Sequence, residues 1–475
     1  MMMDFYEMTM SYGYFRQTHG DVRVAFDLFF RSVPDRGGYA VFAGLEHVIE
    51  FVENLSFSDE DIDYFRAQNL FSEEFLSFLR GFRFRGDIYA VPEGTIIYPN
   101  EPLMTIVAPI IDAQLIETAI LAQINHQSLI ATKASRIVRA AEGRKVSDFG
   151  ARRAHNMDAA TYGARAAYIG GVDMTATVSA GQQFGIPISG TMAHSWVMFF
   201  EDEFTAFKKY AELYPQATVL LVDTYDVLHS GIPNAIRTAH EVLAPRGHRL
   251  AGVRIDSGDL AYLSKRVRTM LDDAGLTDCK IILSNSLDEF TISSLLLQGA
   301  QVDSFGVGER LITAKSDPVF GAVYKLVAVE KDGVFAPRIK MSENVEKLTN
   351  PGIKDLYRIY DRHGKAVADM LALQGEEIDL TKPFRYVDPR KPWKNRFFEG
   401  VTAVNLRRPY MRAGKRVEQL PTLEEVRRYV QKQLTEEIWP EEQRFENPHR
   451  HYLDMTPMYY EVKMGLLDDM RGKHS

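Results

Sequence analysis

Short apolar runs that each end in a polar cluster recur between Lys145 and Val329, and this repetition constrains the fold more than any other feature. Each run is rich in β-branched residues and is followed by Gly, Asp, Ser or Arg and then by an amphipathic segment. About eight strands that alternate with helices are typical of a parallel α/β barrel, whose polar strand ends share one face. The runs are 146–149, 171–175, 186–189, 219–222, 250–253, 280–283, 302–305 and 323–329.

The chain is longer than a barrel alone requires. It has 475 residues, whereas a bare (β/α)₈ unit has about 250. We therefore predict an α/β protein in which an irregular parallel (β/α) barrel over residues 126–330 carries the active site. An N-terminal α+β domain, residues 1–125, flanks the barrel, and a C-terminal extension, residues 331–475, packs back on that domain.

Composition places the chain among soluble globular proteins, because 45% of its residues are hydrophobic and 25% are charged. The net charge of −8 argues against nonspecific nucleic-acid binding, which needs a basic surface. The single cysteine, Cys279, excludes an intrachain disulfide and a multi-cysteine zinc site, and no metal-ligand cluster is assigned. Residues 1–7 lack a basic segment and an apolar core, so we expect neither a signal peptide nor a membrane span. We expect a cytoplasmic location.

One histidine stands out from the twelve in the chain. His194 lies in Gly190–Trp196, directly after the apolar run Ile186–Ile188, which predicts a short buried strand with His194 beyond its carboxyl end. A single histidine is more often a hydrogen-bonded structural residue than a reactive one. The polar residues near the other strand ends favour the reactive interpretation.

Arginines gather in the same region although the whole chain is acidic. Arg152, Arg153, Arg165 and Arg254 lie near predicted strand ends, and an arginine fork binds carboxylate or phosphate at two points. The segment Arg254–Asp259 places opposite charges and a tight turn directly after an apolar strand. Such a cluster, which includes Asp256 and Ser257, suits a sugar phosphate and its magnesium ion.

Two glycines follow the seventh predicted strand. Gly306 and Gly308 allow backbone N–H groups to approach a phosphate closely, and the loops after strands seven and eight of many barrels bind phosphate. A Gly-x-Gly motif alone is equally consistent with a plain turn.

Taken in order, these motifs resemble the nicotinate phosphoribosyltransferases, a family of type II phosphoribosyltransferases. The resemblance covers roughly residues 4–370, and the ordered set is far more specific than any one motif. Besides the His194 and Arg254 motifs, it rests on the segments 4–10, 127–134, 321–327 and 341–344.

The resemblance implies a reaction and its participants. Nicotinate attacks the anomeric carbon of 5-phosphoribosyl pyrophosphate, which gives nicotinate mononucleotide and pyrophosphate in NAD biosynthesis. ATP and Mg²⁺ take part, and hydrolysis of ATP through a phosphohistidine makes the enzyme a ligase-type pentosyltransferase. A homodimer with shared active sites is also implied.

The resemblance assigns roles to individual residues. His194 matches the phosphorylated histidine, Arg254 and Asp256 match residues at the pyridine, phosphate and ribose groups, and Arg152 matches an arginine near the phosphates. The remaining matches, which lie at the base or the sugar phosphate, are Tyr6, Phe149, Asp173, Thr191, Ser257, Gly306 and Gly308.

The chain departs from the family pattern at two places. Only three residues precede the Asp4–Phe5–Tyr6 motif, and Glu309 replaces a threonine found in some members, so no ligand role is assigned to Glu309. Asp173 would repel a nicotinate carboxylate, so a nicotinamide-specific enzyme remains an alternative function. A quinolinate-type enzyme also stays open, as does a non-catalytic barrel that binds a nucleotide or sugar phosphate.

Overall fold

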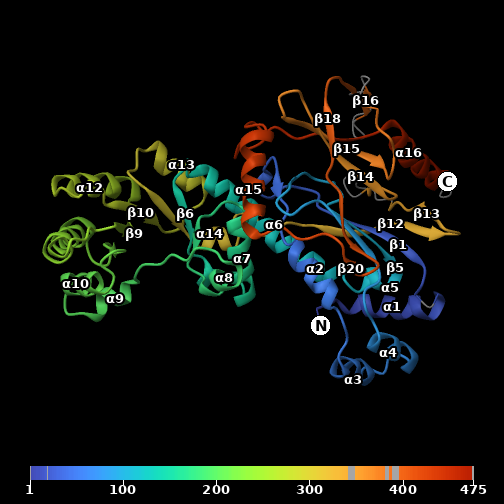
Figure 1. The fold of residues 1–475 in the computed structure, drawn as a ribbon, viewed down its shortest axis with the longest axis horizontal. Coiled ribbons are helices and arrows are strands. Elements are labelled where there is room, and N and C mark those ends of the chain that lie inside the picture. Colours follow the sequence, from blue (N-terminus) through green and yellow to red (C-terminus); the bar gives the residue numbers. More distant parts are fainter. Residues whose placement is uncertain (1, 19, 341–347, 380–383, 388–394, 473–475) are drawn as a thin grey trace. The chain divides into compact units, whose positions relative to one another are not determined.

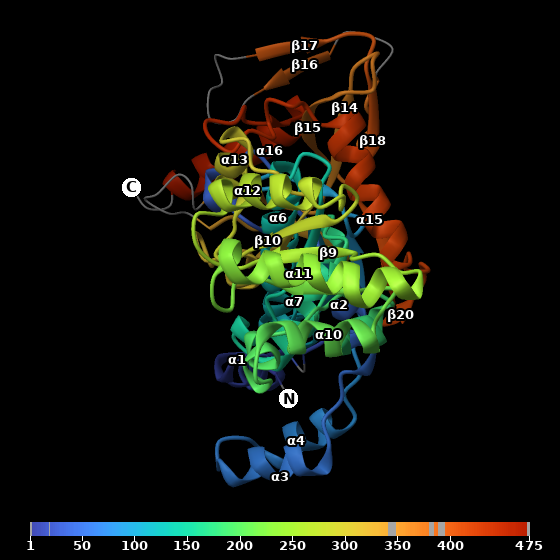
Figure 2. The same ribbon diagram turned by 90° about the vertical axis from the view of Figure 1, so that its left-hand side faces the viewer.

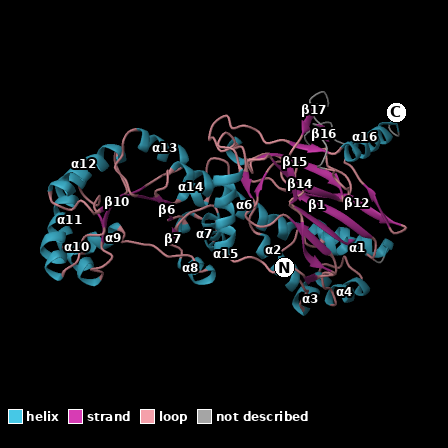
Figure 3. Cartoon of the chain, turned by 45° about the horizontal axis from the view of Figure 1, so that its top comes forward, coloured by secondary structure: helices cyan, strands magenta, loops and turns pink. Residues whose placement is uncertain are grey.

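The computed structural model describes residues 2–18, 20–340, 348–379, 384–387 and 395–472. The chain forms two compact units, and the division falls within one long helix, α6 (Glu117–Ala140). We call residues 1–129 with 319–475 the sheet unit, and residues 130–318 the half-barrel unit. Strands dominate the sheet unit, whereas strands and helices alternate in the half-barrel unit (Figures 1 and 3). The segment 341–344, part of the family resemblance, lies outside the described residues.

The sheet unit is built on a seven-stranded antiparallel sheet of order β13-β12-β1-β5-β3-β19-β20. Its interior strand β1 is buried along nearly its whole length, as its apolar sequence predicts. The one acidic residue in β1, Asp27, forms an ion pair with buried Lys354. The strands are β1 (Arg23–Phe29), β3 (Asp87–Ala90), β5 (Met104–Pro109), β12 (Val323–Lys331), β13 (Val334–Pro337), β19 (Arg408–Arg412) and β20 (Lys415–Arg416).

A second sheet of the same unit has the order β17-β16-β21-β15-β14-β18. Its strands are antiparallel except for the β15–β21 pair. They are β14 (Lys354–Tyr360), β15 (Ala366–Leu373), β16 (Phe384–Val387), β17 (Asn395–Phe398), β18 (Thr402–Asn405) and β21 (Leu453–Met455). A small pair, β2 (Ala40–Val41) and β4 (Ile96–Ile97), completes the described strands of the unit.

Helices of the sheet unit begin where the sequence supplies capping groups. Thr422 and Glu425 form a reciprocal capping box at the start of α15, and Ser58 and Asp61 do the same at α3. The helices are α1 (Phe5–Thr18), α2 (Leu45–Asn54), α3 (Asp59–Ala67), α4 (Glu73–Arg80), α5 (Ile110–Gln114), α15 (Leu423–Lys432) and α16 (Pro457–Gly472).

The half-barrel unit contains a curled parallel sheet of order β7-β6-β11-β10-β9-β8. Its strands are β6 (Lys145–Asp148), β7 (Met174–Thr175), β8 (Val219–Leu221), β9 (Gly252–Ile255), β10 (Lys280–Ser284) and β11 (Ser304–Val307). In Figure 2 the helices α10 (Glu203–Leu213), α11 (Ile232–Thr238) and α12 (Leu260–Asp273) lie in front of β9 and β10. The other helices of the unit are α7 (Met157–Ile169), α8 (Val178–Phe184), α9 (His194–Phe199), α13 (Glu289–Leu297) and α14 (Glu309–Ile312).

Two of the eight predicted strands do not join this sheet as strands. The run 323–329 forms β12, which pairs antiparallel with β1 in the sheet unit. A buried antiparallel strand and a parallel barrel strand are both short apolar runs, so the local pattern could not separate them. The run 186–189 contributes only an isolated parallel bridge between Thr175 and Ile188, and Ile188 is 62% exposed. The parallel architecture is therefore confirmed, but as a half-barrel.

Candidate active site

The carboxyl ends of the six parallel strands meet at one edge of the half-barrel sheet. Because all neighbouring strands run the same way, residues that follow each strand are brought together there. This edge collects Asp148 at the end of β6, Asp223 after β8, Arg254 and Asp256 at β9, and Ser284 at β10. The backbone is also unusual at this edge, because Asn285 and Ser286 directly after β10 have positive φ angles of 97° and 52°. Such strained backbone is concentrated at functional sites.

Arg254 is held by the loop that precedes α9. Its Nη1 donates to the Thr191 hydroxyl at 2.8 Å and its Nη2 donates to the Met192 carbonyl at 3.2 Å. Its guanidinium carbon lies 5.8 Å from the ring centroid of Phe149. Burial lowers the pKa of Arg254 from its usual value, although Asp256 and Asp223 oppose that effect. Its Nε is buried and donates to no acceptor within the described part of the chain.

Gly306 makes room for the Phe149 ring. A Cβ atom at Gly306 would lie 2.4 Å from Cε2 of Phe149, which is far inside van der Waals contact. The Phe149 N–H donates to the Val307 carbonyl at 2.7 Å and ties the segment after β6 to β11. A Cβ at Gly308 would lie 3.2 Å from the Phe149 carbonyl oxygen. In this structure both glycines allow close packing around Phe149, and the phosphate role predicted for them stays a prediction.

Asp256 belongs to a hydrogen-bonded group of polar residues. It accepts a hydrogen bond from the Ser284 hydroxyl at 2.5 Å, and its own N–H donates to Oδ2 of Asp223 at 3.2 Å. The Ser257 hydroxyl donates to the same Asp223 oxygen at 2.6 Å. Oδ1 of Asp223 is buried and has no hydrogen-bond partner among the described residues. The group therefore presents carboxylate oxygens that can accept hydrogen bonds from hydroxyl groups. Asp259, by contrast, caps the N-terminus of α12.

His194 is the first residue of α9 and is half-buried. Its Nδ1 lies 3.1 Å from the Thr224 hydroxyl, which comes from the loop after β8. This contact orients the imidazole and leaves Nε2 as the ring nitrogen on the opposite side. The structure thus places His194 beside the strand end that carries Asp223, although no regular strand precedes it.

Asp148 and Asp173 bind neighbouring backbone and hydroxyl groups. Asp148 accepts hydrogen bonds from the Gly150 N–H and the Thr175 hydroxyl, both at 2.8 Å, and burial raises its pKa. Asp173 accepts from the Val146 N–H at 2.9 Å. Both carboxylates fasten the ends of β6 and β7, and a base contact for Asp173 stays a prediction.

The other arginines differ in their surroundings. Burial is the main cause of the lowered pKa of Arg254. Arg152, which is exposed, lowers this pKa further through charge repulsion. Arg165 lies inside α7, is 1% exposed, and its guanidinium carbon lies 5.8 Å from the Phe184 ring centroid. Glu309 forms ion pairs with Lys315 at 2.6 Å and Arg153 at 3.9 Å. The hydrogen bond and charge of Lys315 lower the pKa of Glu309, so its charge is matched by cations.

Tyr6 lies on α1 in the sheet unit. It is 43% exposed, and burial of its hydroxyl together with the nearby carboxylate of Glu117 raises its pKa well above the usual value. Phe5 and Met10 on the same helix are 51% and 39% exposed. Exposed apolar residues on one helix are typical of a contact surface.

Sequence reasoning assigned no role to Asp223, Thr224 or Asp148. Asp223 and Thr224 directly follow the apolar run 219–222, and Asp148 is next to last in the run 146–149, so their positions carried the same signal as Asp256. The described residues hold no group of three or more His, Cys, Asp or Glu side chains arranged to bind a metal ion. No helix in the described ranges has the length and hydropathy needed to cross a bilayer.

A parallel half-barrel with arginine, paired aspartates and a histidine at its carboxyl edge is a fold and site of the phosphoribosyltransferase class. Three family models match the chain. They are described as the nicotinate phosphoribosyltransferase N-terminal domain (residues 1–125), the nicotinate phosphoribosyltransferase family (144–349) and the nicotinate phosphoribosyltransferase C-terminal domain (353–463).

Individual relatives agree with these models. Nicotinate phosphoribosyltransferase of Bacillus subtilis is 45% identical over 473 residues, which cover 99% of this chain and 95% of that protein. The crystal structure of human nicotinic acid phosphoribosyltransferase matches with a TM-score of 0.88 and 28% identity over 98% of this chain and 100% of that one. The structure of nicotinate-nucleotide pyrophosphorylase from Pyrococcus furiosus matches with a TM-score of 0.70 and 26% identity over 91% and 94% of the two chains. The chain belongs to the nicotinate phosphoribosyltransferase family.

Proposed function

We propose that this protein transfers the phosphoribosyl group of 5-phosphoribosyl pyrophosphate to nicotinate, with coupled hydrolysis of ATP. The products are nicotinate mononucleotide and pyrophosphate, and the reaction serves NAD biosynthesis in the cytoplasm. One observation carries the choice of substrate. The buried Nε of Arg254, beside the Phe149 ring, donates to no acceptor among the described residues.

A buried, unpaired guanidinium nitrogen favours an anionic ligand, because leaving it without an acceptor costs about 1–3 kcal/mol. The carboxylate of nicotinate supplies that acceptor when the pyridine ring stacks on Phe149. The Thr191 hydroxyl and the Met192 carbonyl fix the other two nitrogens, so the guanidinium is oriented before the substrate binds. Nicotinamide lacks the negative charge and gains less from this arrangement.

The ribose and its phosphates are assigned to the polar group at β8, β9 and β10. Asp256 and the unpaired Oδ1 of Asp223 are suited to accept hydrogen bonds from ribose hydroxyls. Mg²⁺ is commonly bound by one or two carboxylates together with substrate phosphates, so this pair fits the ion without a larger ligand cluster. Bound there, Mg²⁺ would neutralise charge on the phosphates. Arg152, near Arg254, adds positive charge on the same side.

The transfer itself needs little acid–base chemistry. The lone pair of the pyridine nitrogen forms a bond to the anomeric carbon, while the bond from that carbon to pyrophosphate breaks and pyrophosphate leaves with the electron pair. The sugar becomes oxocarbenium-like and the leaving group gains negative charge, so fixed charges and donors supply most of the stabilisation. Asp256 stabilises the cationic sugar electrostatically, and Arg254 holds the base in line.

Coupling to ATP is assigned to His194. Its Nδ1 faces Thr224, which leaves Nε2 to attack the γ-phosphorus of ATP. The nitrogen–phosphorus bond forms as the bond to the β-phosphate oxygen breaks, and ADP leaves. Water later cleaves the phosphohistidine and releases inorganic phosphate, which restores the free imidazole.

We assign Tyr6 to the pyridine site of a neighbouring subunit in a homodimer. The exposed apolar side chains of α1 support a contact surface there, since Phe5, Tyr6 and Met10 are each more than a third exposed. A second aromatic ring opposite Phe149 would add about 0.5–1.5 kcal/mol to binding of a flat base, beyond the contribution of the apolar area that it buries.

The test measures pyrophosphate release with 5-phosphoribosyl pyrophosphate, ATP and Mg²⁺ and with nicotinate, nicotinamide or quinolinate in parallel. We expect release with nicotinate and at least a hundredfold lower kcat/KM with the other two. Nicotinamide loses the charge-assisted pair with Arg254, which costs about 3 kcal/mol, and quinolinate brings a second carboxylate for which the site is assigned no cationic partner. Preference for nicotinamide or quinolinate would assign the chain another substrate. No release with any base would indicate a non-catalytic protein.

A further inference from the structure

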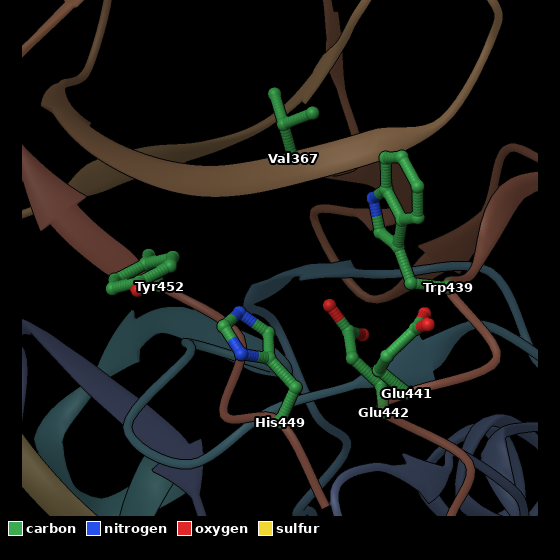
Figure 4. A pocket seen from close by; sticks show the side chains of 6 residues that line it. All are labelled: Val367, Trp439, Glu441, Glu442, His449 and Tyr452. Carbon is green, nitrogen blue, oxygen red and sulfur yellow. The ribbon is translucent and has the colours of Figure 1, made fainter.

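The sheet unit contains a pocket that the proposed reaction does not use. It has a volume of about 320 Å³ and lies between Val367 on β15 and the segment 439–452 (Figure 4). This volume is at the lower end of the range for small-molecule sites, about 300–1,000 Å³. The lining residues are Val367, Trp439, Glu441, Glu442, His449 and Tyr452.

Aromatic rings form the walls of this pocket. Trp439 remains 37% exposed, and its Nε1 donates to the Ala366 carbonyl at 3.0 Å, which fixes the ring. The rings of His449 and Tyr452 pack edge to face with centroids 5.6 Å apart. Figure 4 shows the three rings on different sides of the same space. Fixed aromatic walls of this kind attract cations through the negative ring faces.

Carboxylates form the remaining polar lining. Glu442 is 2% exposed and accepts hydrogen bonds from the Tyr98 hydroxyl at 2.7 Å and from Nδ1 of His451 at 3.0 Å. The side chain of Glu441 is 48% exposed and has a distant ion pair with Arg444 at 3.9 Å. Negative charge at the pocket disfavours anions such as nicotinate or a mononucleotide.

The hydrogen bonds within the lining restrict the kind of cation. Both oxygens of Glu442 already accept from protein donors, and Trp439 already uses its one donor. A primary ammonium or a guanidinium has several N–H groups that need acceptors, and of the two lining carboxylates only that of Glu441 is not already used by short hydrogen bonds. An alkylated ammonium has no such requirement and contacts aromatic faces through its methyl groups.

We propose that this pocket binds a small quaternary ammonium cation, with Trp439 and Tyr452 as its aromatic walls and Glu441 as its main counter-charge. The proposal concerns a ligand and a site separate from those of the transfer reaction. It stands or falls independently of the proposed function.

The test uses full-length protein labelled with 5-fluorotryptophan and followed by ¹⁹F NMR. The chain contains only three tryptophans, so Trp→Phe variants assign the Trp439 resonance. Choline and tetramethylammonium are titrated at pH 8, and 3,3-dimethylbutanol serves as the uncharged analogue of choline. We expect a saturable shift of the Trp439 resonance with both cations and at least fivefold weaker binding of the alcohol. Equal binding of the alcohol, or no shift with either cation, would overturn the proposal.

Two variants locate the site. Trp439→Leu should abolish choline binding, which is then followed by calorimetry, while Trp196→Phe in the half-barrel unit should leave it unchanged. Glu441→Gln, at an exposed position where folding is not at risk, should weaken choline binding at least threefold and leave binding of the alcohol unaltered. Unchanged choline affinity in Glu441→Gln would contradict the assigned counter-charge and overturn the proposal.

Discussion

Arg254 shows how one residue can be prepared for a ligand. Two of its guanidinium nitrogens are fixed by Thr191 and Met192, and the third is buried without an acceptor in the described structure. A lysine at this position would keep the charge but would lose both the fork and the donor at Nε. We therefore expect substrate binding to depend on the shape of the guanidinium as well as on its charge.

We predict that Arg254→Lys lowers kcat/KM for nicotinate by roughly thirty- to a thousandfold, or about 2–4 kcal/mol. Steady-state kinetics of pyrophosphate release measure this loss. Arg249→Lys is the matched control, because the side chain of Arg249 is 81% exposed and pairs with Asp278 at the surface. Wild-type kinetics in Arg254→Lys would show that catalysis does not depend on the guanidinium hydrogen bonds of Arg254.

Gly306 tests the position of the Phe149 ring. We predict that Gly306→Ala displaces this ring and raises KM for nicotinate at least fivefold, since overpacking costs about 1–3 kcal/mol. Gly465→Ala is the control, because Gly465 lies in helix α16 with nothing within 4 Å of an added Cβ. That variant should keep KM and gain roughly 0.5–1 kcal/mol of stability. An unchanged KM in Gly306→Ala would mean that Phe149 does not contact the base.

At the scale of elements, the sequence predicted the parallel strands well because each is an apolar run closed by a polar cluster. The strand ends also identified Arg254 and Asp256, and the family resemblance added Phe149. The sheet brings all three to one edge. The same pattern misplaced the run 323–329, because pairing with β1 is a long-range choice that no local pattern encodes. The contact between Thr224 and His194 was missed for the same reason, since it joins a loop to the start of α9, thirty residues away in the chain.

Roles that depend on the exact position of a neighbouring residue could also not be predicted from the sequence. Nothing in the sequence indicates that Asp173 accepts a hydrogen bond from the Val146 N–H, or that Glu309 pairs with Lys315. Both contacts give acidic residues a partner within the protein. The local motif could only show that these charges lie near a candidate phosphate site.

A buried charge network joins β14 and β15 to the segment before β21. Arg358 on β14 binds both oxygens of Asp369 on β15, and Nε2 of His451 lies 3.4 Å from Asp369. Burial lowers the pKa of His451, but the carboxylates of Asp369 and Glu442 outweigh burial and leave that pKa above its usual value. A raised histidine pKa contributes stability that is complete below the unfolded value, about 6.5, and is lost as pH rises through the folded value.

We predict that His451→Gln lowers the free energy of unfolding by roughly 3 kcal/mol at pH 6, and by clearly less at pH 9. Denaturant unfolding of wild type and variant at both pH values, at one protein concentration, measures the difference. His449→Gln, at an exposed neighbouring position, should change stability little at either pH. A loss in His451→Gln that does not vary with pH would contradict protonation of His451 in the folded state.

At the scale of the whole molecule, the proposed mechanism requires a homodimer in which Tyr6 completes the site of the other subunit. We predict that Tyr6→Ala and Arg254→Ala are each inactive alone and partly recover activity when mixed after reversible dissociation. Mixed dimers would then contain one intact site. If Tyr6 acts within its own chain, every site keeps one lesion and the mixture stays inactive.

The central claim is that residues at one edge of the parallel sheet catalyse phosphoribosyl transfer and that His194 couples this transfer to ATP hydrolysis. The most direct test compares two products of one reaction. Release of ADP and of pyrophosphate is measured for wild type, His194→Asn and the exposed neighbour Ser195→Ala. We predict that wild type and Ser195→Ala release both products and carry acid-labile phosphate. His194→Asn should release no ADP yet still form pyrophosphate at high substrate concentration, because the proposed mechanism gives His194 no contact with the transferred ribosyl group. ADP release by His194→Asn at the wild-type rate would contradict this mechanism.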